Sequence, residues 1–282
     1  MNLIDTHAHV NFKAFSVDAE EVILNSLNNG VGMILAGSNL KTSRRALDLA
    51  NKYERGVWAA VGLHPIHLED EVEISEDGRE VVRFRAEEFN YDSYEKFASF
   101  EKVVAIGEIG LDYHHLKLNE NLPATKKKQK DVFWQELLLA RRLNLPAIIH
   151  CRVAHDDMLS IIKEFKEENK NLFTPREEWG VLHCFSGDEN LAWQYFSLGL
   201  MISFTGLITF SCQWDDLIRK MPADKFMVET DCPYMTPEPF RGRRNEPMLV
   251  SYVAERIAEI RGVMPDKIAE LSLANSQRFF NI

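Results

Sequence analysis

Eight short apolar runs alternate with longer amphipathic segments along the 282 residues of the chain. Several runs are apolar nearly throughout, which is typical of parallel strands buried on both faces. Eight strand–helix units predict an α/β protein that forms a single TIM-type (β/α)8 barrel over residues 1–282. A doubly wound open sheet is the main alternative. The expected strands lie in NLID (2–5), GMILAG (32–37), VWAAVGLHP (57–65), VVAIGEIGLDY (103–113), PAIIHC (146–151), WGVLHCF (179–185), GLMISFTG (199–206) and FMVETDCPY (226–234).

The segments between these runs carry helical periodicity. In residues 130–146, Phe133, Leu137 and Ala140 or Arg141 follow helical spacing, and Pro146 opens the next strand. Two final segments, 246–262 and 264–280, are predicted to be helices that close the fold.

One stretch breaks this rhythm after the third expected strand. In residues 71–89, apolar and charged residues alternate on both sides of a turn signal at Glu76-Asp77-Gly78. The pattern predicts a β-hairpin inserted in a connecting loop rather than a separate domain.

Six residues with metal-binding side chains end or follow the apolar runs. They are His7, His9, Glu108, His150, His183 and Asp231. In a barrel the carboxyl ends of the strands converge on one rim, where active sites are built. Taken alone, His7 and His9 could be polar loop residues, although alternate residues of a strand share one face. Five separate strands that each end in a His, Asp or Glu predict a metal site instead.

Four imidazoles and two carboxylates are too many ligands for one tetrahedral ion. The set suits two divalent metal ions about 3.5–4 Å apart with a carboxylate bridge, and Glu108 is the expected bridge. The imidazoles favour zinc or manganese over magnesium, although any of the three could support activity. The expected sets are His7, His9, Glu108 and Asp231 for one ion, and Glu108, His150 and His183 for the other.

These residues belong to a series of short motifs that spans nearly the whole chain. The motifs are DTHAH (5–9), GLHP (62–65), GEIGLDY (107–113), HCR (150–152), HCFSG (183–187), TG (205–206), ETDCPY (229–234) and RRNEP (243–247). Together and in this order they resemble the TatD family of metal-dependent deoxyribonucleases, within the amidohydrolase-like barrels. The resemblance implies a TIM barrel, a two-metal site and hydrolysis of phosphodiester bonds, often from the 3′ end of single strands. The hairpin departs from the shorter members of the family, and we expect it on the same rim as the site.

Catalytic roles are expected for Asp231, Glu108 and His64. Asp231 could bind a metal ion with one oxygen and accept the proton of the attacking water with the other. His64 ends the third strand, where it could contact the phosphate or the leaving oxygen of the substrate. A structural histidine in front of Pro65 is the alternative for this position.

Five further residues near the expected rim are candidates for substrate binding: Arg152, His155, Ser186, Arg243 and Arg244. Arginine forks bind phosphate well, and His155 stands near a helix start, where backbone N–H groups favour anions. The structural alternatives are a surface ion pair for Arg152, a plain turn for Ser186 and a charged loop for the two later arginines.

Composition limits the partners of the chain. Its formal net charge of −10 argues against a broad cationic face for duplex DNA, so we expect a nucleic-acid substrate that is bound at single-stranded ends. The chain lacks a recognisable signal peptide and has no apolar run of about 18 residues, which argues against membrane insertion. The four cysteines form no C-x-x-C motif, and we expect reduced packing thiols. These features predict a cytoplasmic enzyme that is a monomer without an obligate protein partner.

Two other functions stay open from the sequence alone. A two-metal amidohydrolase could act on an ester or amide, such as a D-aminoacyl-tRNA. Many such enzymes bridge their ions with a carbamylated lysine, whereas this chain has Glu108 there and no lysine nearby. A non-catalytic barrel would be free to lose ligands, but this chain retains all six.

Overall fold

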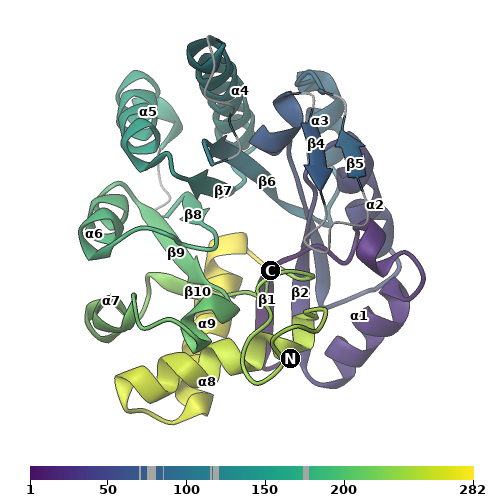
Figure 1. Cartoon of the computed structure of the whole chain (residues 1–282), viewed down its shortest axis with the longest axis vertical. Coiled ribbons are helices and arrows are strands. Elements are labelled where there is room, and N and C mark those ends of the chain that lie inside the picture. Colours follow the sequence, from purple (N-terminus) through teal and green to yellow (C-terminus); the bar gives the residue numbers. More distant parts are fainter. Residues whose placement is uncertain (70, 75–80, 85, 115, 117–120, 174–177) are drawn as a thin grey trace.

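The computed structural model describes the whole chain except residues 70, 75–80, 85, 115, 117–120 and 174–177. In the described part, eight parallel strands form one sheet in chain order (Figure 1). This order confirms the barrel and excludes a doubly wound sheet, whose strand order reverses. The strands are β1 (Leu3–Ala8), β2 (Val31–Ala36), β3 (Val57–Val61), β6 (Val103–Asp112), β7 (Ala147–Arg152), β8 (Gly180–Leu182), β9 (Leu200–Phe204) and β10 (Phe226–Val228).

The sheet closes into a nearly complete barrel where the chain after β10 returns to β1. The backbone N–H of Asp231 donates to the carbonyl of His7, and that of His9 donates to the carbonyl of Cys232, both at 2.9 Å. Ala8 and Cys232 also form an isolated parallel bridge. Because Asp231 lies three residues beyond β10, the closure takes place at the carboxyl-end rim, beside the two N-terminal histidines.

Helices surround the barrel, and the two predicted closing helices are present (Figure 1). The helical spacing in residues 130–146 is confirmed, because Phe133, Leu137 and Ala140 are all buried on α4. In the described part of the chain, no helix is long and apolar enough to cross a membrane. The helices are α1 (Ala19–Asn28), α2 (Leu40–Ala50), α3 (Tyr91–Ala98), α4 (Leu122–Arg142), α5 (His155–Glu168), α6 (Glu189–Ser197), α7 (Asp215–Lys220), α8 (Val250–Arg261) and α9 (Pro265–Phe280).

The interior of the barrel is filled by apolar side chains from every strand. Phe279 and Phe280 of α9 belong to the same cluster, so the C-terminal helix seals this layer. A larger apolar cluster packs the outer faces of the strands against the helices. With both faces buried, the barrel holds rigid strand ends on which a site can be positioned. The interior residues are Ile4, Ile34, Ala60, Val104, Ala105, Ile148, Val181, Met201 and Met227.

The predicted hairpin is present between β3 and α3. Strand β4 (Glu71–Ile74) pairs with β5 (Val81–Phe84) in an antiparallel ladder that aligns Glu71 with Phe84. The predicted turn at 76–78 lies outside the described residues, and 86–89 follow the hairpin rather than belonging to it. Since the insertion connects a strand to the next helix, it leaves the barrel from the carboxyl-end rim, as expected.

The four cysteines all lie in the described part of the chain, and none forms a disulfide there. Cys151 and Cys232 are buried and Cys184 is partly buried. The prediction of a packing thiol is wrong for Cys212, which is exposed in the segment that precedes α7.

Candidate metal centre

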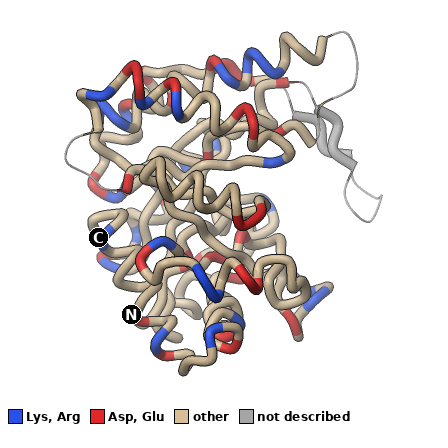
Figure 2. Tube along the Cα trace, turned by 90° about the vertical axis from the view of Figure 1, so that its left-hand side faces the viewer, with Lys and Arg blue, Asp and Glu red and all other residues tan. Residues whose placement is uncertain are grey.

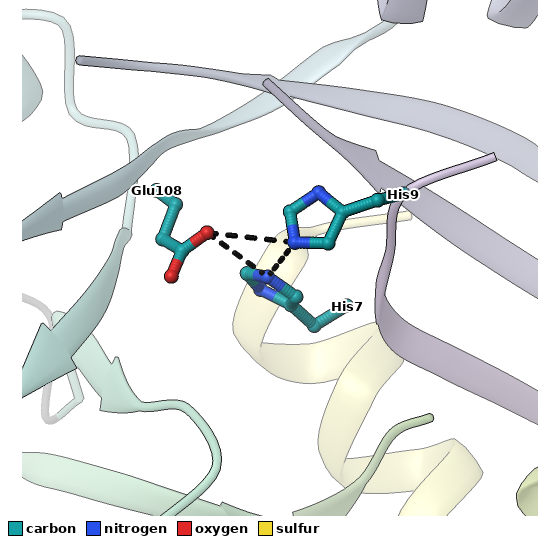
Figure 3. Close-up of side chains that lie close together, drawn as sticks. All are labelled: His7, His9 and Glu108. Atoms are coloured by element: carbon teal, nitrogen blue, oxygen red, sulfur yellow. Dashed lines mark hydrogen bonds and ion pairs between the residues drawn. The ribbon is translucent and has the colours of Figure 1, made fainter. Parts of the chain in front are cut away.

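One group of side chains gathers where β1, β6 and the end of β10 meet. The Nε2 atoms of His7 and His9 lie 3.0 Å apart. Oε2 of Glu108 lies 3.4 Å and 3.5 Å from these two nitrogens (Figure 3). Oδ1 of Asp231 lies 3.4 Å from Nε2 of His9 and 3.8 Å from that of His7. The four side chains are buried. The donor atoms of His7, His9 and Glu108 lie close enough to hold one ion, and Asp231 forms a similar group with His7 and His183.

The other carboxylate oxygen of Glu108 faces a second group. Oε1 lies 2.7 Å from Nε2 of His183 and 2.9 Å from Nδ1 of His150. These two nitrogens are 3.1 Å apart. The two oxygens of Glu108 therefore face the two predicted ligand sets separately.

The spacing of the donor atoms fits metal coordination. In a tetrahedral zinc site with bonds of about 2.0–2.1 Å, neighbouring ligand atoms lie roughly 3.3–3.4 Å apart. The separations in both groups run from 2.7 Å to 3.8 Å. Four imidazole nitrogens and two carboxylates are also the ligands that zinc and manganese accept. The residues present thus fit a divalent metal ion in each group.

Outer partners orient two of these imidazoles. Nδ1 of His9 lies 3.0 Å from the carbonyl of Ala36, which can only accept, so this nitrogen carries hydrogen and Nε2 is left as the ligand. Nε2 of His150 lies 3.1 Å from Oδ2 of Asp112, which leaves Nδ1 to face Glu108. Such carboxylate and carbonyl partners fix the tautomer of a metal-binding histidine.

The sequence reasoning missed three buried carboxylates around these ligands. Besides Asp112, they are Glu229, with Oε1 3.5 Å from Nδ1 of His183, and Asp5, which accepts from the backbone N–H of Thr230 at 2.9 Å. Glu229 also accepts from the backbone N–H of Cys184 and from the Ser203 hydroxyl, both at 2.6 Å. Asp5 and Glu229 each precede a predicted ligand by two residues, and this same-face spacing is the signal that could have revealed them.

Glu108 does not end its strand, which corrects the prediction for this residue. β6 continues for four residues to Asp112, and its pairing with β7 shifts in register between Ile106 and Ile109. The extension depends on Gly110, whose φ is +142° and where a Cβ would lie 2.1 Å from the carbonyl oxygen of His150. Because only glycine fits there, β6 can follow β7 and carry Asp112 to His150.

The electrostatics of the cluster favour ionised carboxylates. Burial alone would raise the pKa of Glu108, but the surrounding imidazoles of His64, His183 and His7 hold that pKa well below its usual value. Burial is likewise outweighed at Asp231, where the hydrogen bond with His9 helps to lower the pKa. Carboxylates that remain ionised are ready to bind cations without first losing a proton.

His64 lies at the edge of the second group. Its Nδ1 accepts a hydrogen bond from the backbone N–H of Ile66 at 3.0 Å, so Nε2 carries hydrogen in the neutral ring. Nε2 lies 3.3 Å from Oε1 of Glu108. Burial lowers the pKa of His64, which favours this neutral form. His64 therefore presents a hydrogen-bond donor to the site, while also capping the 3-10 helix Pro65–Leu68.

Three of the predicted substrate contacts lie on the rim beyond His150. Arg152 ends β7 and is exposed, and α5 begins at His155. Nε2 of His155 lies 3.3 Å from the hydroxyl of Ser186, and its Nδ1 lies 2.9 Å from that of Tyr195. Ser186 is exposed, so its hydroxyl can reach a ligand at the start of α5.

The two later arginines have different surroundings. Arg243 is exposed, with its guanidinium carbon 5.8 Å from the centre of the Phe240 ring. Arg244 instead binds both oxygens of Asp18, at 3.1 Å and 2.6 Å, and Glu246 at 2.9 Å. These contacts hold Arg244 in place between α1 and the loop after β10.

A (β/α)8 barrel with these imidazole and carboxylate ligands at its carboxyl-end rim defines a metal-dependent hydrolase. The family model described as TatD related DNase matches residues 4–281. The chain is 36% identical over 283 residues to "Uncharacterized metal-dependent hydrolase YabD" of Bacillus subtilis, covering 99% of both. It is 31% identical over 288 residues to "3'-5' ssDNA/RNA exonuclease TatD" of Erwinia tasmaniensis, covering 99% of this chain and 100% of the other.

A solved structure agrees with these relatives. The TatD homolog YJJV of Escherichia coli matches with a TM-score of 0.81 and 31% identity, over 100% of this chain and 98% of that one. The chain belongs to the TatD family of metal-dependent hydrolases.

Proposed function

We propose that this hydrolase cleaves phosphodiester bonds at the 3′ ends of single-stranded DNA or RNA, with two divalent ions bound per chain. The observation that supports the proposal is that the two carboxylate oxygens of Glu108 face different histidines. Oε2 faces His7 and His9, and Oε1 faces His150 and His183. Two cation sites that share one carboxylate suit the displacement of an oxygen at phosphorus. The naming of a relative as a 3′–5′ exonuclease on single strands supports the same substrate class.

Each residue of the site has a role in this proposal. Bound divalent ions would lower the pKa of a water molecule and neutralise charge on the phosphate. The ionised carboxylate of Asp231 accepts the proton of the attacking water. The Nε2–H of His64 donates to a phosphate or leaving oxygen. Glu108 holds the two cation sites at a fixed separation.

Substrate positioning falls to groups around the ligands. Arg152, His155 and Ser186 contact a phosphate near the amino end of α5, where backbone N–H groups add to the attraction. Arg243 supplies a further cation from the loop after β10. Arg244 is left out because Asp18 and Glu246 already bind it.

The charge distribution favours single strands over duplex. The net charge is −10, and in the view of Figure 2 basic and acidic residues are interspersed rather than gathered on one basic face. A long duplex is bound mainly through many phosphates, which this surface cannot contact in number. We therefore expect activity at single-stranded ends with modest salt dependence, from an enzyme that acts as a monomer.

The test is a panel of substrates with Mg²⁺, Mn²⁺ or Zn²⁺ added to protein that was first treated with a chelator. The panel contains 5′-labelled single-stranded DNA and RNA, a blunt duplex, closed circular duplex, a D-aminoacyl-tRNA and simple esters, with Asp231→Asn as control. Stepwise shortening of the 5′-labelled single strands from their 3′ ends, absent in the control, is the expected result. Faster cleavage of circular duplex, or turnover of only the D-aminoacyl-tRNA or esters, would overturn the proposal.

A further inference from the structure

Two exposed aromatic side chains flank the loop that carries Asp231. Phe210, after β9, is 42% exposed, and Tyr234, after β10, is 51% exposed. With the exposed Arg241 and Arg243 of the same loop, they form a surface that we call the aromatic shelf. The metal centre and the phosphate contacts described above do not use the two rings.

The shelf combines rings with cations. The guanidinium carbon of Arg241 lies 4.0 Å from the centre of the Phe210 ring, so the charged group stacks on the ring. Its Nη1 also donates to the carbonyl of Thr236 at 3.0 Å, which fixes the position of the side chain. Among the described residues, neither Arg241 nor Arg243 forms an ion pair with an acidic side chain, whereas Arg244 beside them pairs with two. The shelf thus offers unpaired positive charge on a protein with a net charge of −10.

Backbone contacts tie the shelf to the metal centre. The N–H of Tyr234 donates to the carbonyl of Asp231 at 3.0 Å, so one tight turn separates the ring from the predicted base. The segment before Phe210 packs on the same loop, because the N–H of Glu238 donates to the Thr209 hydroxyl at 2.9 Å. At Gly206 a Cβ would lie 2.1 Å from the carbonyl oxygen of Met235. The two rings therefore lie on two segments of the rim that contact each other.

We propose that the aromatic shelf is a stacking subsite for the bases of a single-stranded nucleic acid, on the 5′ side of the phosphate that is cleaved. One base stacks on Tyr234 and another on the guanidinium plane of Arg241, which Phe210 supports, while Arg243 meets the backbone. Aromatic rings and guanidinium planes hold unpaired bases in this way without reading their identity. Because the shelf is exposed to solvent, it suits the part of the strand that extends away from the metal centre rather than the terminal nucleotide. This inference rests on the proposed function and adds to it the recognition of the strand.

The test compares Phe210→Ala and Tyr234→Ala with Phe100→Ala as a matched control. Phe100 is 43% exposed, but it precedes β6 and so lies at the opposite end of the barrel. With 5′-labelled single-stranded DNA, we expect each shelf variant to raise KM by about 5- to 30-fold with little change in kcat, the lower part of the range for base stacking. Phe100→Ala should behave like wild type. Unchanged metal content and thermal unfolding of the variants would show that the fold is intact.

A second measurement separates stacking from a structural role. Oligonucleotides in which single nucleotides on the 5′ side of the cleaved bond lack their base should raise the KM of the wild type to a similar extent. For Tyr234→Ala, KM should not rise further when the missing base is the one that stacks on Tyr234. The missing base and the missing ring remove the same interaction. If the shelf variants match Phe100→Ala, or if missing bases have no effect on the wild type, the inference is wrong while the proposed function stands. If the wild type cleaves no single strand, both are wrong.

Discussion

Nε2 of His150 lies 3.1 Å from Oδ2 of Asp112, while Nδ1 of the same ring lies 2.9 Å from Oε1 of Glu108. The ring of His150 thus lies between two carboxylates. Asp112 orients it, and Glu108 belongs to both ligand groups of the metal centre. Asp112 also accepts a hydrogen bond from the backbone N–H of His114 at 2.8 Å, so it is itself held in place.

Replacement of Asp112 tests this arrangement. Asp112→Asn should weaken metal binding by about 10- to 100-fold, the usual effect of losing a carboxylate partner of a ligating histidine. The fold should survive, because the side-chain volume is nearly unchanged and the apolar interior of the barrel is not altered. Metal titration followed by calorimetry measures the effect, with Asp48→Asn on the exposed face of α2 as the control. An affinity equal to that of the wild type would show that His150 needs no such partner.

Removal of metal tests the number of ions. The two groups around Glu108 predict that elemental analysis approaches two divalent ions per chain. Chelation should abolish hydrolysis but leave the barrel folded, since its apolar interior packs without any metal. Circular dichroism and thermal unfolding of the chelated protein provide the check. Saturation at one ion, with His150→Ala and His183→Ala unaffected, would contradict the two-ion assignment.

Asp231 and Glu108 should respond differently to neutral substitution. Asp231→Asn keeps a ligating oxygen but loses basicity, so we expect kcat to fall by about 10²- to 10⁴-fold with at least one ion retained. Glu108→Gln weakens both groups at once, so metal content and rate should fall together. Measuring rate and bound metal on the same samples is necessary, because a rate loss alone cannot separate a lost base from a lost ion. Near-normal kcat for Asp231→Asn at saturating metal would exclude Asp231 as the base.

Gly110 should be required for the geometry of the site. A Cβ there would lie 2.1 Å from the carbonyl oxygen of His150, and the φ of +142° disfavours any side chain. We expect Gly110→Ala to lower the free energy of unfolding by roughly 2–4 kcal/mol and to weaken metal binding. Gly262→Ala is the control, because its φ is +65° but a Cβ would meet nothing within 4 Å. Denaturant unfolding of both variants distinguishes the clash from backbone strain, which should cost only about 1 kcal/mol at Gly262.

The six residues at the strand ends could be predicted from the sequence more easily than the residues around them. The strand-like runs predicted the barrel, and the six polar residues at their ends do lie close together, because parallel strands bring their carboxyl ends together. Asp112 lies within the expected strand 103–113, but its contact with His150 could not be predicted, because it depends on a close approach between two backbones. The pairing of Arg244 with Asp18 could not be predicted either, because the two residues lie 226 positions apart in the chain. Local patterns do not report such distant pairings.

His67 provides a prediction for stability against pH. It is 6% exposed, and its Nε2 lies 3.1 Å from the Ser38 hydroxyl. Its backbone N–H donates to the carbonyl of His64 at 3.0 Å. Burial is the main cause that lowers the pKa of His67 from 6.5 to about 4, and the neighbouring imidazole of His64 adds to it. Between pH 4 and pH 6.5, His67 is protonated in the unfolded chain but neutral in the folded protein. The free energy of unfolding therefore rises with pH in this range. The stabilisation is complete above pH 6.5 and is lost as the pH falls toward 4.

Linkage gives the size of this effect. On going from pH 7.5 to pH 5, His67 alone should lower the free energy of unfolding by about 2 kcal/mol. Other groups titrate in the same range, so the informative quantity is the difference between wild type and His67→Gln. Urea unfolding of metal-free protein at both pH values measures it without a contribution from metal binding. The variant should lose about 2 kcal/mol less than the wild type on acidification, whereas equal losses would mean that His67 titrates normally in the folded protein.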